Sequence, residues 1–174
     1  MKTLNFTSGG HVSIAQTITS LEAVLDLAVW LEKHGRSFYE KAERETADAA
    51  VKELFRTLAA EEGKHCAMYT DLYEIYTGKS AEGDELLGDY GKFIQLLFAE
   101  IVGELEFEGV VSQEELITRA LQFEKNTLLF FSEVKPLFRG KAGTIIEVVC
   151  REEKRHIQQL MERRQLLRQQ GQNT

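Results

Sequence analysis

The chain has 174 residues, of which 43% are hydrophobic and 28% charged, a balance typical of globular proteins that excludes a disordered or fibrous one. Its formal net charge of -7 argues against a general nucleic-acid binder, whose affinity depends on neutralising phosphates. No apolar run approaches the roughly 18 residues that a membrane span requires, and the first residues carry no signal-peptide pattern. We therefore expect a soluble, cytoplasmic protein that binds neither nucleic acid nor membrane.

Long helices are expected because the sequence contains one proline, Pro136, and proline ends or kinks helices. Residues 1–18 show no periodicity and are predicted to form an extended or mobile lead. Apolar residues at helical spacing then predict a hairpin of two helices over 20–77, with capping signals at Thr19 for the first helix and Asp48 for the second.

A long connection follows this hairpin and spans residues 78–111. It is rich in glycine and contains an apolar stretch, 93–99, that predicts a shorter helix. Ser112 followed by Glu115 has the spacing of a capping box, which opens a second helix hairpin over 112–168. Its first helix is predicted to extend as far as Phe138, and its second helix to begin near residues 140–144.

The lengths of the connections indicate the kind of bundle. The loops within the hairpins are short and the connection between them is long, which is typical of a four-helix bundle with one long crossover. The sequence therefore predicts an all-α fold with a single domain over residues 19–170. We expect this domain to form a homodimer.

Glutamate and histidine side chains lie on the apolar stripes of all four long helices. Glu62 and His65 are three residues apart, almost one helical turn, and Glu153 and His156 repeat this spacing. A buried carboxylate is costly unless a positive charge meets it, and no lysine or arginine falls beside these positions on the stripes. Because a carboxylate and an imidazole bind transition metals together, metal cations are the natural partners.

The two hairpins repeat one another in sequence. A lone glutamate, Glu32 or Glu124, precedes the histidine by 33 residues in the first half and by 32 in the second. The motif Glu-Glu-x-x-His occurs at 61–65 and again at 152–156. Pairing the hairpins about a pseudo-twofold axis would gather four carboxylates and two imidazoles, the ligand set of di-iron carboxylate bundles. We therefore expect two metal ions per chain.

This pattern resembles the rubrerythrin-like branch of the ferritin-like superfamily over nearly the whole chain, from about residue 20 to residue 160. The resemblance is carried by Glu32, by Tyr39 seven residues later, and by the Glu-x-x-His motifs. It implies a ferritin-like fold in which each metal has a terminal carboxylate and one imidazole, two further carboxylates bridge the metals, and the Tyr39 hydroxyl holds a carboxylate. The implied terminal carboxylates are Glu32 and Glu124, the bridges Glu62 and Glu153, and the nitrogen ligands His65 and His156.

The resemblance also implies a di-iron oxidoreductase that oxidises Fe(II) or reduces hydrogen peroxide or oxygen. Two departures bear on this. Cys66 and Cys150 form no paired CxxC motifs, so a rubredoxin-like iron site is missing and electrons must come from an external donor. Thr127 stands where rubrerythrins carry an additional glutamate that exchanges with a histidine, so we expect single-turnover ferroxidation to be easier to observe than continuous peroxidase cycling.

Several alternatives stay open at the level of sequence. The protein can be a metal-binding or iron-handling protein without turnover, and its ligand set also suits manganese or zinc. Gly35 and Gly63 lie within helices, where glycine costs about 1 kcal/mol against alanine, and they serve either close packing or space beside the metals. Cys66 and Cys150 adjoin the motifs and are expected to be inert thiols.

Overall fold

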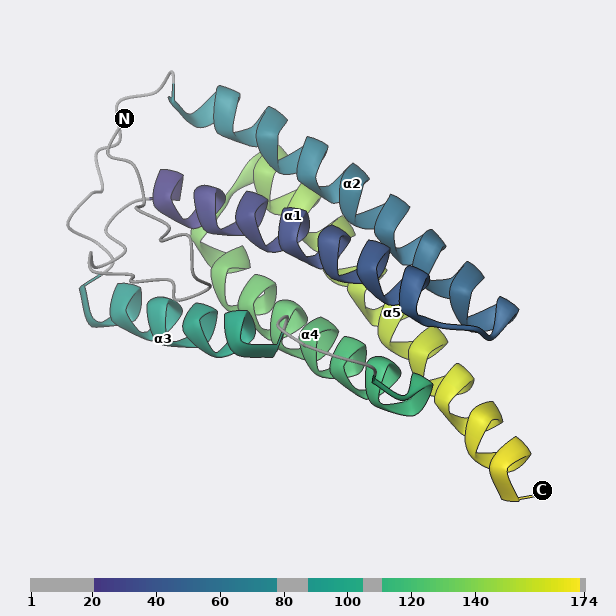
Figure 1. Cartoon of the computed structure of the whole chain (residues 1–174). Coiled ribbons are helices and arrows are strands. Elements are labelled where there is room, and N and C mark those ends of the chain that lie inside the picture. The colour runs from purple at the N-terminus through teal and green to yellow at the C-terminus, as the bar shows by residue number, and fades with distance from the viewer. Residues whose placement is uncertain (1–20, 78–87, 105–110, 173–174) are drawn as a thin grey trace.

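The computed structural model describes residues 21–77, 88–104 and 111–172, and these residues form helices without a strand (Figure 1). The predicted all-α fold class is confirmed. The predicted lead over 1–18 and the Thr19 capping signal lie outside the described residues. The helices are α1 (Leu21–Glu45), α2 (Ala49–Thr77), α3 (Gly88–Glu104), α4 (Gln113–Val134) and α5 (Gly140–Gln172), with a short 3-10 helix, η1 (Lys135–Leu137), between the last two.

The four long helices pack as two hairpins. α1 lies against α2 and α4 against α5, and contacts of α2 with α5 and of α1 with α4 close the bundle. α3 belongs to the crossover and packs on α4, where the Tyr90 hydroxyl donates to the carbonyl of Glu133 at 2.6 Å. α3 is longer than the helix predicted over 93–99.

Helix caps form at two of the predicted positions. The Asp48 carboxylate accepts the backbone N–H groups of Ala50 and Val51, both at 2.9 Å, and so caps α2. The Ser112 hydroxyl accepts the N–H of Glu115 at 3.2 Å and caps α4. The Glu115 carboxylate pairs with Arg119 at 2.8 Å, so we observe the hydroxyl half of the predicted capping box.

The prediction that Phe138 belongs to the third long helix is wrong. α4 ends at Val134, and Pro136 lies in η1, because a proline ring cannot continue the helical hydrogen bonding. Phe138 is nevertheless buried in the core. α5 starts at Gly140, whose φ of 59° favours glycine, within the range predicted for this helix.

The core is apolar along the bundle but polar near the middle. Its largest buried side chains are aromatic rings and leucines, including Phe55, Tyr69 and Phe131. Among them, four glutamates and two histidines are also fully buried. No helix in the described ranges combines the length and apolar character needed to cross a membrane.

Candidate metal centre

The six buried glutamates and histidines come from all four long helices and meet in the centre of the bundle. α1 provides Glu32 and α4 provides Glu124, while α2 and α5 each provide a Glu-x-x-His pair. Every one of these side chains is at most 1% exposed. The structure therefore brings together the full set of residues predicted from the sequence, namely Glu32, Glu62, His65, Glu124, Glu153 and His156.

The set divides into two overlapping groups of four residues. Within each group, one nitrogen or oxygen atom from every residue lies within 4.8 Å of the others. Glu62 and Glu153 belong to both groups, whereas each remaining glutamate and histidine belongs to one. Two groups that share two carboxylates are compatible with a pair of metal ions. We call the group with Glu32 and His65 the first position and the group with Glu124 and His156 the second.

The two imidazoles face the carboxylates in closely similar ways. Nδ1 of His65 lies 3.4 Å from Glu32, 3.2 Å from Glu153 and 3.8 Å from Glu62. Nδ1 of His156 lies 3.4 Å from Glu124, 3.3 Å from Glu153 and 3.7 Å from Glu62. The rings are nearly parallel, with centroids 5.7 Å apart. The pseudo-twofold repeat in the sequence is thus present in the geometry of the site.

Most polar atoms that face the middle of this cluster lack a hydrogen-bond partner among the residues that the structure describes. They are both oxygens of Glu32, Glu62 and Glu153, one oxygen of Glu124, and Nδ1 of both histidines. Buried polar atoms without partners are rare because each carries an uncompensated desolvation cost. Oxygen and nitrogen atoms converging in this way fit a pair of transition-metal ions, and the cluster is compatible with a di-iron site.

Crowding and burial shift the pKa values of the carboxyl groups. Burial raises the pKa of Glu32, and burial together with the charge of Glu32 raises the pKa of Glu62 well above its usual value. Burial and the nearby charge of Glu153 raise the pKa of Glu124 to about 8. Burial opposes ionisation of Glu153 as well, but its close polar contacts with Glu124 and with both imidazoles lower its pKa.

The histidines are shifted by the same neighbours. Burial alone would lower the pKa of His65, but the carboxylates of Glu153, Glu32 and Glu62 raise it well above its usual value. Burial would also lower the pKa of His156, but the neighbouring carboxylates, chiefly Glu124, raise it to about 11. In the metal-free protein, protons on the imidazoles and carboxyls therefore offset part of the negative charge that metal cations would otherwise offset.

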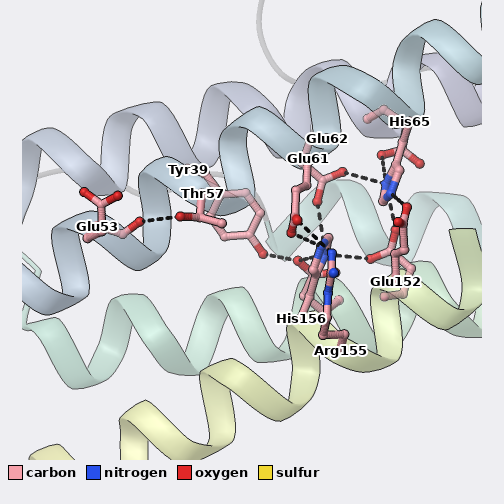
Figure 2. Close-up of polar contacts among 12 residues, drawn as sticks. Tyr39, Glu53, Thr57, Glu61, Glu62, His65, Glu152, Arg155 and His156 are labelled. Carbon is pink, nitrogen blue, oxygen red and sulfur yellow. Dashed lines mark hydrogen bonds and ion pairs between the residues drawn. The ribbon is translucent and has the colours of Figure 1, made fainter.

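Two further glutamates, not assigned a role from the sequence, hold the outer nitrogens of the histidines (Figure 2). Nε2 of His65 lies 2.7 Å from Glu152, and Nε2 of His156 lies 2.9 Å from Glu61. Each Glu-Glu-x-x-His motif thus supports the histidine of the other hairpin. These contacts keep Nδ1 of both rings directed at the centre, as carboxylate partners of metal-bound histidines do.

Tyr39 lies where the resemblance implies, beside a carboxylate of the cluster. Its buried hydroxyl donates a hydrogen bond to Glu124 (Figure 2). Its repeat partner is Phe131, whose ring stacks on Tyr69 at 5.1 Å between centroids. The Tyr69 hydroxyl is buried and has no hydrogen-bond partner within the described part of the chain.

The structure also describes Thr127, Cys66 and Cys150. Thr127 is buried, and its hydroxyl has no hydrogen-bond partner in residues 21–77, 88–104 and 111–172. Cys150 is buried and Cys66 half-buried, and both thiols are free. Burial raises the pKa of Cys150, which agrees with an unreactive thiol.

A helical bundle with this buried glutamate and histidine set is consistent with a ferritin-like bundle. Residues 11–73 match the model of the family described as Rubrerythrin, a stretch that includes α1 and most of α2. The match is consistent with a rubrerythrin-like, ferritin-like protein and confirms the resemblance over that segment. No match is found among curated proteins or solved structures.

Proposed function

We propose that the protein is a di-iron carboxylate oxidoreductase that oxidises Fe(II) or reduces hydrogen peroxide or oxygen. The observation that supports this most strongly is the pair of buried four-residue groups that share Glu62 and Glu153. In the proposal, Glu32 and His65 would hold one metal ion, Glu124 and His156 would hold the other, and Glu62 and Glu153 would serve both.

The chemistry of two iron ions suits this reaction. When bound, each ion supplies one electron on passing from the ferrous to the ferric state, so a pair matches the two electrons that convert hydrogen peroxide and two protons into two water molecules. Carboxylates stabilise the higher charge of the ferric ions, and manganese or zinc also accept such ligands.

The residues around the cluster have roles that follow from their contacts. Glu152 and Glu61 orient the imidazoles, and Tyr39 holds Glu124. Phe55 and Phe123 are fully buried beside Tyr39, with ring centroids 6.0 and 6.3 Å from the Tyr39 ring, and they exclude bulk water from that side. A dry site strengthens each electrostatic contact with the bound ions.

A stopped-flow experiment tests the proposal. Protein loaded anaerobically with Fe(II) is mixed with hydrogen peroxide, and we expect the near-ultraviolet absorption of ferric iron to develop within seconds. Glu62→Ala removes a carboxylate common to both positions and should abolish this protein-dependent signal. Glu53→Ala is the matched control, because Glu53 lies on the same helix, is exposed and pairs with Arg56.

The absence of a reaction with either peroxide or oxygen would contradict the oxidoreductase proposal. Iron binding without a reaction would instead favour the second candidate, an iron-handling protein without turnover. Thr127 supports this second candidate, because its buried hydroxyl stands where the resemblance to rubrerythrins implies a carboxylate. For the same reason, we expect one round of oxidation to be faster than repeated turnover, which depends on an external electron donor.

A further inference from the structure

The two metal positions are built by a sequence repeat, but the groups behind their ligands differ. Position by position, Glu61 corresponds to Glu152, Lys64 to Arg155 and Tyr39 to Phe131. The first pair is identical, the second keeps a positive charge on a different side chain, and the third lacks the hydroxyl in the second hairpin. These differences affect the relative affinity of the two positions for metal, a question that rests on the proposed two-metal function.

Behind the second position, Arg155 forms an ion pair with Glu61, the glutamate that holds the histidine. Its guanidinium lies 2.7 Å from Glu61, which in turn lies 2.9 Å from Nε2 of His156 (Figure 2). Glu152, which holds His65 at 2.7 Å, forms no ion pair with a lysine or arginine within the described ranges. Lys64, the repeat partner of Arg155, is exposed and does not reach it.

The terminal carboxylates, Glu32 and Glu124, also differ in their hydrogen bonding. Glu124 of the second position accepts a hydrogen bond from the Tyr39 hydroxyl. Glu32 of the first position accepts none from the described residues, because Phe131 occupies the repeat position of Tyr39 and has no hydroxyl.

Both differences make the ligands of the second position, His156 and Glu124, weaker electron-pair donors to a metal ion. A carboxylate that accepts the outer N–H of an imidazole raises the basicity of its inner nitrogen. An arginine bound to that carboxylate draws part of its charge away, and a hydroxyl hydrogen bond does the same to a ligating carboxylate. Because Arg155 is 48% exposed, water screens its effect, so we expect a bias between the positions rather than the loss of one.

We propose that the first position, with Glu32 and His65, is the tighter of the two and takes the first metal ion. Arg155, acting through Glu61, and Tyr39, acting on Glu124, set this order. They are positioning residues that make a symmetric ligand set bind its two ions in sequence.

The test must identify which position fills first, because repulsion between neighbouring cations separates two binding steps even at equal positions. Anaerobic titration with Co(II), followed by its visible absorption, gives both affinities without any redox reaction. His156→Ala should keep the affinity of the first step. His65→Ala should weaken that step by about tenfold or more, the scale on which contacts around a metal ligand change affinity. Equal losses in the two variants, or a larger loss in His156→Ala, would overturn the proposal.

Variants of the exposed side chains of Arg155 and Lys64 test whether Arg155 sets the order of binding, and they leave the core unchanged. Arg155→Gln should raise the affinity of the second step severalfold and leave the first unchanged, because Glu61 regains its full charge. Lys64→Gln removes the same charge at the repeat position, where no ion pair exists within the described ranges, and should change neither step. A second step that is unchanged or weakened in Arg155→Gln would contradict the proposed role of Arg155.

This titration separates the inference from the function on which it rests. If the protein binds no Co(II) and no Fe(II), the proposed two-metal function fails. If it binds two ions but fills the second position first, the function stands and the inference fails.

Discussion

At the scale of single residues, the cluster depends on contacts that cross between the hairpins. Glu152 on α5 holds His65 of α2, and Glu61 on α2 holds His156 of α5. Neither carboxylate faces the centre, and their side chains are 35% and 17% exposed. Their contribution is to fix which nitrogen of each imidazole is directed inward, so they are expected to govern metal affinity without being ligands.

We therefore expect Glu152→Ala to lower the affinity for a divalent metal by about 10- to 100-fold, because His65 loses the acceptor that orients it. The measurement is a competition titration against a chelator of known affinity. Glu147→Ala serves as the control, since Glu147 lies on the same helix, is exposed and pairs with Lys135. An unchanged affinity in Glu152→Ala would show that the contact does not orient the ligand.

Sequence and structure agree on the inward-facing residues for a physical reason. A carboxylate on an apolar stripe is conspicuous, because burial without a partner is costly. The six predicted side chains are consequently together in the fold, whereas their role as ligands stays a prediction. Glu61 and Glu152 gave a weaker signal: the repeat marked them, but their partners lie 95 and 87 residues away along the chain, and helical spacing does not predict contacts between helices.

At the scale of helices, the glycine in α1 and the glycine in α2 differ in what surrounds them. A Cβ atom at Gly35 would lie 2.7 Å from the Phe123 ring, and 3.6 Å from the carboxyl carbon of Glu62. A Cβ atom at Gly63 would meet Arg36 at 3.5 Å, an ordinary contact. The structure thus assigns close packing to Gly35, one of the two roles that the sequence left open, because the Phe123 ring of α4 fills the space beside it.

Alanine at these two positions should have opposite effects on stability. Gly35→Ala forces the buried Phe123 ring to move, and overpacking of this kind costs about 1–3 kcal/mol. Gly63→Ala gains up to about 1 kcal/mol from helix propensity. Urea unfolding of the metal-free variants measures both changes. A neutral Gly35→Ala would mean that the helices move apart at little cost, in disagreement with the packing described above.

Helix boundaries were predictable where local chemistry decides them, and less so elsewhere. Asp48 and Ser112 have side chains that satisfy the first N–H groups of the following helices, so their caps were visible in the sequence. The sequence pattern predicts too late an end for α4, because the apolar Phe138 continues the helical spacing beyond Pro136, whereas the helix ends at Val134. A residue can remain in the core after its helix has ended.

At the scale of the whole molecule, the charged groups in the core link folding to the binding of protons and of metal ions. The carboxylates and imidazoles were brought together by four helices whose packing is otherwise apolar. Without metal, protons compensate this charge, as the raised pKa values of Glu124 and His156 indicate. Metal binding must displace these protons, so metal affinity is expected to rise with pH.

The metal-free protein should lose stability as the pH rises. The pKa of Glu124 is raised from 4.5 to about 8 and that of His156 from 6.5 to about 11, so the folded state binds these protons more tightly than the unfolded state. The stabilisation is complete below the unfolded values and is lost as the pH rises through the folded ones. Urea unfolding at about pH 6 and about pH 9 should show a lower unfolding free energy at the higher pH. Metal-loaded protein should not show this loss, and a metal-free protein that is more stable at high pH would contradict the assignment.

The central claim is that one chain binds two metal ions in its core. The most direct measurement is equilibrium dialysis against Fe(II) under anaerobic conditions, followed by elemental analysis of iron and protein. The two overlapping groups of Glu32, Glu62, His65 and Glu153 and of Glu62, Glu124, Glu153 and His156 predict saturation at two equivalents per chain. Glu62→Ala, which lacks a carboxylate shared by both groups, should fall below that value at the same free Fe(II). Saturation of the unmodified protein at one equivalent, or no binding, would contradict the claim.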